Sequence, residues 1–147
     1  MPTDTAPSAT AVRSDSGPRG VLALGTSWLA LEQWDGGLAI VEPCDAAVES
    51  LAIDVGSAVP RVYHFYGQEA ELYEVRARQE EDSLLRLDIA SRWDSGTVQL
   101  VVRDRQTGVV EVTEQTGRGP RSGLFVSAGN AAGFRRIPRG PPRCEEP

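Results

Sequence analysis

The sequence predicts an all-β fold, either an antiparallel up-and-down barrel or a two-sheet sandwich, with about eight to ten short strands. Apolar and polar residues alternate with a period of two along several segments, which is typical of half-buried strands. Clusters of Gly, Asp and Ser separate these segments, as tight hairpin turns require. The short connections favour the barrel. The segment 116–123 could supply the long crossing connection of a sandwich, so both architectures stay open.

The first predicted element is a hairpin. Residues 27–34 and 38–42 flank the run Asp35-Gly36-Gly37, whose residue types suit the positive backbone angles of a hairpin turn. Downstream of it, Asp45 is placed to cap a helix of one or two turns that would end near Glu49. We expect no longer helix in this part of the chain.

Alternation predicts the later strands. Tyr73, Val75 and Ala77 alternate with charged residues, which places the three on one face of a strand. Turn residues at 94–96 and 104–108 separate the segments that follow. The further predicted strands cover residues 51–55, 61–66, 85–90, 98–103, 110–113, 124–128 and, on a weaker pattern, 134–137.

The chain of 147 residues is long enough for one domain with a substantial core. Residues 1–19 are rich in Pro, Ser and Thr and bury little apolar area, so we expect a flexible arm. Residues 138–147 are rich in Pro and Arg and are expected to form an extended tail. The β domain is therefore predicted over residues 20–137.

The basic residues are all arginine, 15 in number, with no lysine. Schiff-base catalysis and phosphate-loop chemistry, which need a lysine, are thereby excluded. The net charge of −6 is unevenly distributed, because residues 1–117 hold nine Arg against nineteen acids and residues 118–147 hold six Arg against two. An acidic body with a basic end suits an arm that contacts an acidic partner, or one that lies on its own domain.

The two cysteines, Cys44 and Cys144, lack the spacing of a zinc site or a disulfide framework and are predicted to be free thiols. The N-terminal residues show neither a positive leader nor an apolar core, and no apolar run is long enough to span a bilayer. We therefore expect a cytoplasmic protein that makes no membrane contact.

His64, the only histidine, lies in an aromatic cluster on a predicted strand. Alternation places His64 on the same face as Val62 and Tyr66. If that face lines a barrel, His64 and Tyr66 form a candidate catalytic pair for proton transfer. If the opposite face is inside, His64 is a surface residue. No base or co-ligand lies near it in the sequence, which favours a structural role.

Arginines near the C-terminal end form the candidate anion site. Arg118 and Arg121 lie in a Gly-rich segment, and guanidinium groups suit carboxylate and phosphate oxygens. Arg135 and Arg136 follow downstream as candidate contacts to a partner. Phe134 is their only aromatic neighbour, whereas binders of single-stranded nucleic acid usually interleave several aromatics with such charges. Nucleic-acid binding is accordingly the weaker hypothesis.

Trp28 and Trp34 share one face of the first strand, and Leu29 and Leu31 share the other. Whichever face is not core leaves apolar surface for a partner or a ligand, unless the strand is covered on both sides. The acidic residues around Glu74 match no calcium loop, and we predict neither a metal nor a cofactor.

The leading functional hypothesis is a non-catalytic β module that contacts a protein partner or itself as a homo-oligomer, through Trp28, Trp34 and the Arg-rich end. The alternative is a barrel that encloses an apolar small molecule and works as a cofactor-free cyclase or isomerase. The third hypothesis is nucleic-acid binding through the Arg-rich segment.

Overall fold

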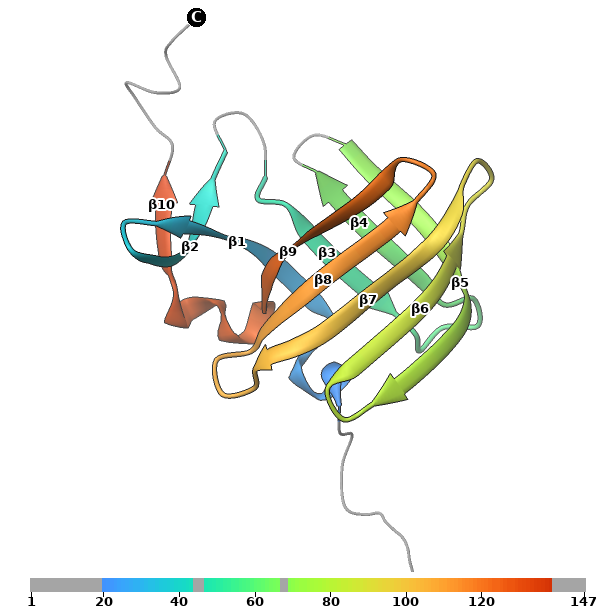
Figure 1. The fold of residues 1–147 in the computed structure, drawn as a ribbon, viewed down its shortest axis with the longest axis horizontal. Coiled ribbons are helices and arrows are strands. Elements are labelled where there is room, and N and C mark those ends of the chain that lie inside the picture. The colour runs from blue at the N-terminus through green and yellow to red at the C-terminus, as the bar shows by residue number, and fades with distance from the viewer. Residues whose placement is uncertain (1–19, 44–46, 67–68, 139–147) are drawn as a thin grey trace, which may run out of the picture.

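The computed structural model describes residues 20–43, 47–66 and 69–138, which form an all-β fold, as the sequence predicts (Figure 1). Two short 3-10 helices accompany the strands, η1 (Val21–Leu24) and η2 (Ala128–Gly133). The strands are β1 (Ser27–Trp34), β2 (Gly37–Glu42), β3 (Ser50–Asp54), β4 (Arg61–Tyr66), β5 (Glu69–Glu81), β6 (Leu84–Ala90), β7 (Ser95–Asp104), β8 (Val109–Thr116), β9 (Gly119–Ser127) and β10 (Arg135–Pro138).

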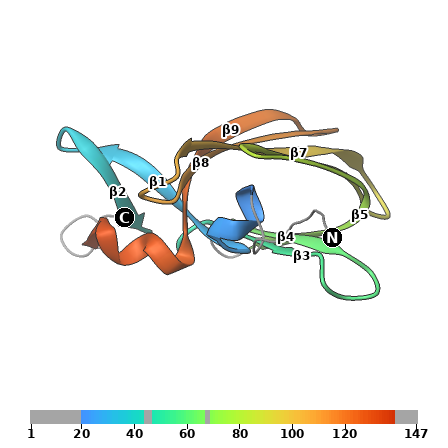
Figure 2. The same ribbon diagram turned by 90° about the horizontal axis from the view of Figure 1, so that it is seen from below.

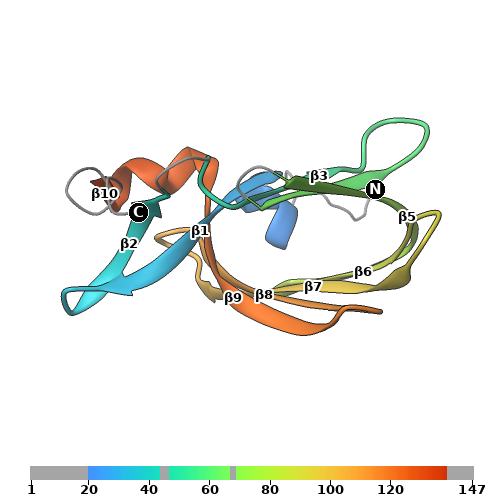
Figure 3. The same cartoon turned by 90° about the horizontal axis from the view of Figure 1, so that it is seen from above.

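Eight of these strands close into an antiparallel barrel. Strands β3 to β9 pair in chain order, and β1 joins the two ends of this series by pairing with both β3 and β9. Viewed end-on, β3 and β4 lie on one side, β7 to β9 lie on the other, and β5 curves between them (Figures 2 and 3). Closure leaves these eight strands without a free edge for most of their length, so the barrel is the correct one of the two predicted architectures.

A small extension projects from the barrel. The second half of β1 continues beyond the barrel and forms a hairpin with β2, and β10 pairs with β2 in parallel. The turn residues Asp35 and Gly36 both have positive φ, as a tight two-residue hairpin requires, which confirms the predicted turn. The predicted helix cap Asp45 lies outside the described residues, and residues 47–49 have no regular structure.

The segment 116–123 is not the long crossing connection that a sandwich would need. Residues 117 and 118 form a tight turn, and β9 begins at Gly119 and pairs with β8 from Gly119 to Val126. The turn predicted at 94–96 lies earlier in the chain than expected. Ser91 and Asp94 form the bend, and β7 already begins at Ser95. Strand pairing there prevails over the local turn preference of Ser and Gly.

Strand β5 departs from simple alternation. Tyr73 is buried and Val75 half-buried as predicted, but Ala77 is exposed. A bulge between Val75 and Ala77 inserts one residue, so the inward positions beyond it fall on Arg78, which pairs with Leu87, and on Glu80. Tyr73, Val75 and Ala77 therefore do not all lie on the inward face of β5, contrary to the prediction.

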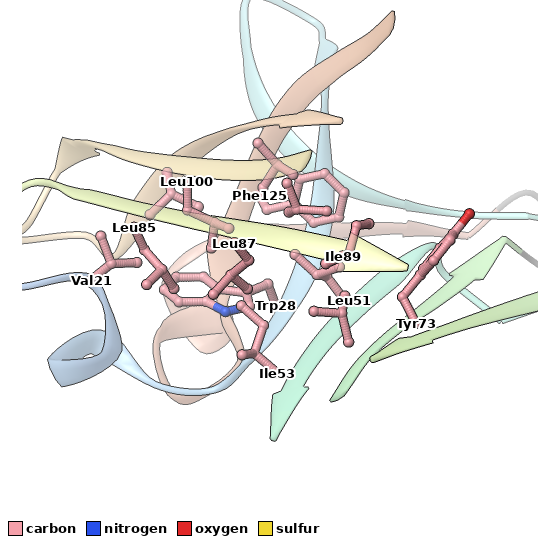
Figure 4. Close-up of a cluster of buried hydrophobic side chains, with 14 residues drawn as sticks. Val21, Trp28, Leu51, Ile53, Tyr73, Leu85, Leu87, Ile89, Leu100 and Phe125 are labelled. Carbon is pink, nitrogen blue, oxygen red and sulfur yellow. The ribbon is translucent and has the colours of Figure 1, made fainter. Parts of the chain in front are cut away.

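The inward residues of the barrel strands form one core (Figure 4). Trp28 from β1 is 0 % exposed and lies at its centre, and Val21 of η1 packs at one end of the barrel. The predicted alternation in β6 to β8 is confirmed by the buried side chains of these strands, namely Leu85, Leu87, Ile89, Val98, Leu100, Val110 and Val112.

A second apolar cluster covers the other face of β1. Leu31, Ile40 and Val126 are buried there, and Phe134 packs against them from beyond η2. Strand β1 is therefore covered on both sides, and Trp28 is unavailable to a partner, contrary to the predicted contact role. Trp34 is half-buried in the projecting hairpin, and its carbonyl oxygen accepts a hydrogen bond from Arg135 Nη2 at 2.8 Å.

Candidate functional site

A cavity of about 560 Å³ opens at the end of the barrel away from η1, beside the segment that joins β2 to β3. This volume suits a small organic molecule. Somewhat more of its wall is apolar than polar, and the polar side chains come from β1, β4, β8, β9 and the segment between β2 and β3. The lining residues are Ala30, Leu31, Glu32, Val41, Pro43, Ala47, Val48, Glu49, His64, Tyr66, Val112, Glu114, Arg121, Ser122, Gly123, Leu124 and Phe125.

His64 lies between two carboxylates in this wall. It points inward from β4 and is 3 % exposed. Its Nδ1 lies 2.7 Å from Glu114 Oε2, and its Nε2 lies 2.7 Å from Glu49 Oε2. An ionised carboxylate only accepts hydrogen bonds, so two such contacts require a proton on each ring nitrogen. The geometry therefore fits an imidazolium ion.

The same two carboxylates determine the ionisation of His64. Burial has the largest single effect and lowers its pKa, because it penalises the charged form. The hydrogen bonds and negative charges of Glu114 and Glu49 together outweigh burial and raise the pKa of His64 above the usual 6.5. The fold thus favours the protonated form of His64 more strongly than an ordinary histidine environment does.

Glu114 is the buried anchor of the site. It points inward from β8, and its Oε1 accepts hydrogen bonds from Tyr66 Oη at 2.9 Å and Arg121 Nη2 at 2.8 Å. Tyr66 also stacks on the imidazole of His64, with ring centroids 3.9 Å apart, and the guanidinium of Arg121 lies 4.0 Å from the centroid of the Tyr66 ring. These contacts fix the position of Glu114 and, through it, of His64.

Glu49 differs from Glu114 in its exposure. It lies in the segment between β2 and β3, and its side chain is 41 % exposed. Because it also lines the cavity, Glu49 offers a carboxylate that a ligand can reach. The site therefore combines one buried, fully bonded carboxylate with one accessible carboxylate on either side of a single imidazole.

A second polar network adjoins the first through Tyr66. Glu71 Oε1 accepts hydrogen bonds from Tyr66 Oη at 3.2 Å and Tyr73 Oη at 3.1 Å, and Arg118 Nη1 lies 2.5 Å from Glu71 Oε2. Burial and the negative charge of Glu71 raise the pKa of Tyr73 to about 12. Tyr73 therefore remains a neutral hydrogen-bond donor at physiological pH.

Gly123 leaves space for the cavity. It shares the inward face of β9 with Arg121 and Phe125, and a Cβ atom built on it would meet only Phe125, at 3.9 Å. A larger residue here would extend into the cavity without striking the backbone. The absent side chain is thus part of the shape of the site.

The structure brings His64, Tyr66 and Arg121 together and places the other candidate residues elsewhere. Arg118 and Arg121 each pair with a barrel carboxylate, so the predicted anion site is occupied by the chain's own Glu71 and Glu114. Arg135 bonds to the β1–β2 hairpin, and Arg136 lies 3.7 Å from Glu42 Oε2 on β2. Neither downstream arginine lines the cavity.

Glu49 and Glu114 were not predicted from the sequence. Glu114 carried a usable signal, because it continues the inward positions of Val110 and Val112 and is thus an acid on the buried face of a strand. Glu49 carried none, since it lies outside any regular element and meets His64 only through the fold.

Comparisons with known proteins found no matching family model, no matching curated protein and no matching solved structure. The described part of the chain contains no helix long and apolar enough to cross a membrane. It also contains no cluster of His, Cys, Asp or Glu side chains with the geometry of a metal site. Cys44 and Cys144 lie outside the described residues.

Proposed function

We propose that this protein is a small-molecule enzyme that catalyses a proton-transfer reaction, an isomerisation or cyclisation, without a cofactor. The observation that carries the proposal is His64, buried in the wall of an apolar cavity with a carboxylate 2.7 Å from each ring nitrogen. Acids and bases paired at the wall of a ligand-sized cavity are well placed to move a proton within a bound molecule.

The charges of the site favour a neutral substrate. Arg121 is paired with Glu114, and Arg118 with Glu71, so each guanidinium charge is balanced by a carboxylate of the chain itself. Among the other polar residues of the lining, which include Glu32 and Ser122, His64 and Glu49 suit a carbonyl or hydroxyl oxygen next to an acidic C–H bond. The apolar wall accommodates the hydrocarbon body of such a molecule.

In the proposed reaction, Glu49 is the base and His64 is the acid. Glu49 removes a proton from the carbon next to the substrate carbonyl; the electron pair of that C–H bond forms a carbon–carbon double bond, and the π pair of the carbonyl moves to its oxygen. His64 Nε2–H, released from Glu49, donates a hydrogen bond to this developing enolate. Glu49 then returns the proton to a carbon conjugated with the enolate; the carbonyl re-forms and the double bond shifts, so the reaction needs no further reactant. Glu114 acts as a positioning residue that holds the imidazole through Nδ1.

Hydrogen–deuterium exchange of 2-tetralone tests this proposal, because this neutral ketone fits the cavity volume and loses an α-proton by the same step. Its α-proton signals are followed by NMR in deuterated buffer. We expect the protein to accelerate exchange about a hundredfold over buffer, within the range of positioned general acid–base catalysis. Glu49→Gln and His64→Gln should each abolish most of this acceleration.

Two glycine variants provide the matched control. Gly123→Leu fills the cavity and should stop both binding and exchange, whereas Gly129→Leu, at an open and exposed position of η2, should change neither. Binding of 2-tetralone without faster exchange in the wild type, or exchange that survives Glu49→Gln, would contradict the catalytic proposal.

The other two hypotheses remain predictions. Assembly through the tryptophan hairpin loses its main residue, because Trp28 is buried in the core. Nucleic-acid binding loses Arg118 and Arg121, which pair with carboxylates of the barrel. A different surface, unrelated to either set of residues, favours self-association and is described next.

A further inference from the structure

The outward face of β4 and β5 carries an unusual set of apolar side chains. On β4, Tyr63 and Phe65 point outward and stack, with ring centroids 6.4 Å apart and planes within 5°. On β5, Leu72 lies beside Tyr63 and Ala70 lies beside Phe65. Phe65 is 39 % exposed and Leu72 is 50 % exposed. We call these four residues, Tyr63, Phe65, Ala70 and Leu72, the apolar face.

The rest of the barrel exterior has a different composition. The outward positions of β6 hold Arg86 and Asp88, and Arg103 on β7 pairs with Glu111 on β8. Contiguous exposed apolar side chains are uncommon on a protein that works alone and usually mark a binding surface. The apolar face is therefore a local feature that the barrel fold itself does not require.

We propose that a second copy of this chain docks on the apolar face, related to the first by a two-fold axis that runs between β4 and β5. Such an axis sets β4 of each copy against β5 of the other. Tyr63 then meets Leu72 of the second copy, and Phe65 meets Ala70 of the second copy. Each contact joins a large side chain to a smaller or flexible one, as close packing of two sheets requires.

The charges next to the apolar face support this placement. Arg61 on β4 is the register partner of Glu74 on β5, so the same axis sets Arg61 opposite Glu74 of the second copy and Glu74 opposite its Arg61. Within the described residues Glu74 pairs only weakly, with Arg76 at 3.4 Å, and both of these side chains are exposed. An axis along β4 would instead set Arg61 opposite Arg61 of the second copy, which is a repulsive contact. The charges therefore favour an axis that lies between β4 and β5.

Sedimentation velocity of the full chain tests the proposal, with Leu72→Asp as the first variant. We expect the wild type to dimerise at micromolar to submillimolar concentrations. Leu72→Asp should weaken dimerisation at least roughly tenfold, because it places a charge at the centre of the interface. The matched control is Arg86→Glu on β6, outside the apolar face, which should leave dimerisation unchanged.

A charge-exchange pair tests the geometry itself. Arg61→Glu alone and Glu74→Arg alone each create like-charge contacts in a homodimer and should weaken it. A mixture of these two variants should form a heterodimer about as tight as the wild type, since each of its two contacts between positions 61 and 74 then joins an acid to an arginine. A wild type that stays monomeric would overturn the proposal. So would a dimer that is unaffected by Leu72→Asp, or a mixture that does not recover.

The outcome is independent of the proposed enzyme activity. The apolar face lies outside the barrel, and His64 and Glu49 lie at the inner cavity. If the protein catalyses 2-tetralone exchange but does not dimerise, only the proposed interface is contradicted. If it dimerises but does not catalyse exchange, only the proposed enzyme activity is contradicted.

Discussion

At the scale of single residues, the site shows which roles a sequence pattern can reveal. Alternation places His64 and Tyr66 on one face of their strand, because a strand turns successive side chains to opposite faces, and the structure shows that His64 on this face is buried. The same rule could have identified Glu114 as an acid on the apolar face of β8, although this residue was not predicted. No local rule connects Glu49 with His64, because their contact depends on how the segment between β2 and β3 crosses the barrel end.

The raised pKa of His64 predicts a specific dependence of stability on pH. Its imidazolium form is favoured in the folded protein, so the stabilisation is fully present below pH 6.5 and is lost as the pH rises through the folded-state pKa. NMR titration of the imidazole should give a midpoint above 6.5, and Glu114→Gln should lower it. In urea denaturation, the free energy of unfolding of the wild type should fall as the pH rises through the folded-state pKa of His64, and His64→Gln should not show this fall. A wild-type midpoint at or below 6.5 would contradict the bridged geometry.

At the scale of elements, strand positions were predictable and strand ends were less so. The hairpin turn at Asp35 and Gly36 was found because its residue types fit its positive φ angles. The start of β9 was missed because Gly119 and Pro120 resemble loop residues, although they pair with β8 in the structure. The bulge in β5 was missed because an inserted residue has no signature in hydropathy alone.

Gly96 lies where β7 and β8 approach each other too closely for a side chain. It lies within β7, and a Cβ atom built on it would be 1.9 Å from the carbonyl oxygen of Gln115 on β8. Gly96→Ala should therefore lower the free energy of unfolding by about 1–3 kcal/mol, because the two strands must separate locally. Gly56→Ala is the matched control, since nothing lies within 4 Å of its Cβ position. Equal stability of the two variants in urea denaturation would show that the close approach is absent in solution.

At the scale of the whole molecule, closure of the barrel was the least predictable feature. Neighbouring strands from β3 to β9 follow one another in the chain, and their order follows from short connections. The pairing of β1 with β9 joins segments that are far apart in the sequence, and the alternation of either strand contains no information about it. The same closure explains why Trp28 is core: its strand is the seam between the two ends of the sheet.

Trp28 and Trp93 provide the test of this core. Trp28 is 0 % exposed and contacts the single apolar cluster that all the barrel strands share, whereas Trp93 is 86 % exposed in the β6–β7 turn. Trp28→Ala should lower the free energy of unfolding by about 3–5 kcal/mol, since it leaves a large cavity at the seam. Trp93→Ala should change it by less than about 0.5 kcal/mol.

Because Trp28 lies outside the apolar face, any folded fraction of Trp28→Ala should dimerise like the wild type. If Trp28→Ala weakened association but left the free energy of unfolding unchanged, Trp28 would be a surface residue, and the closed barrel would be contradicted.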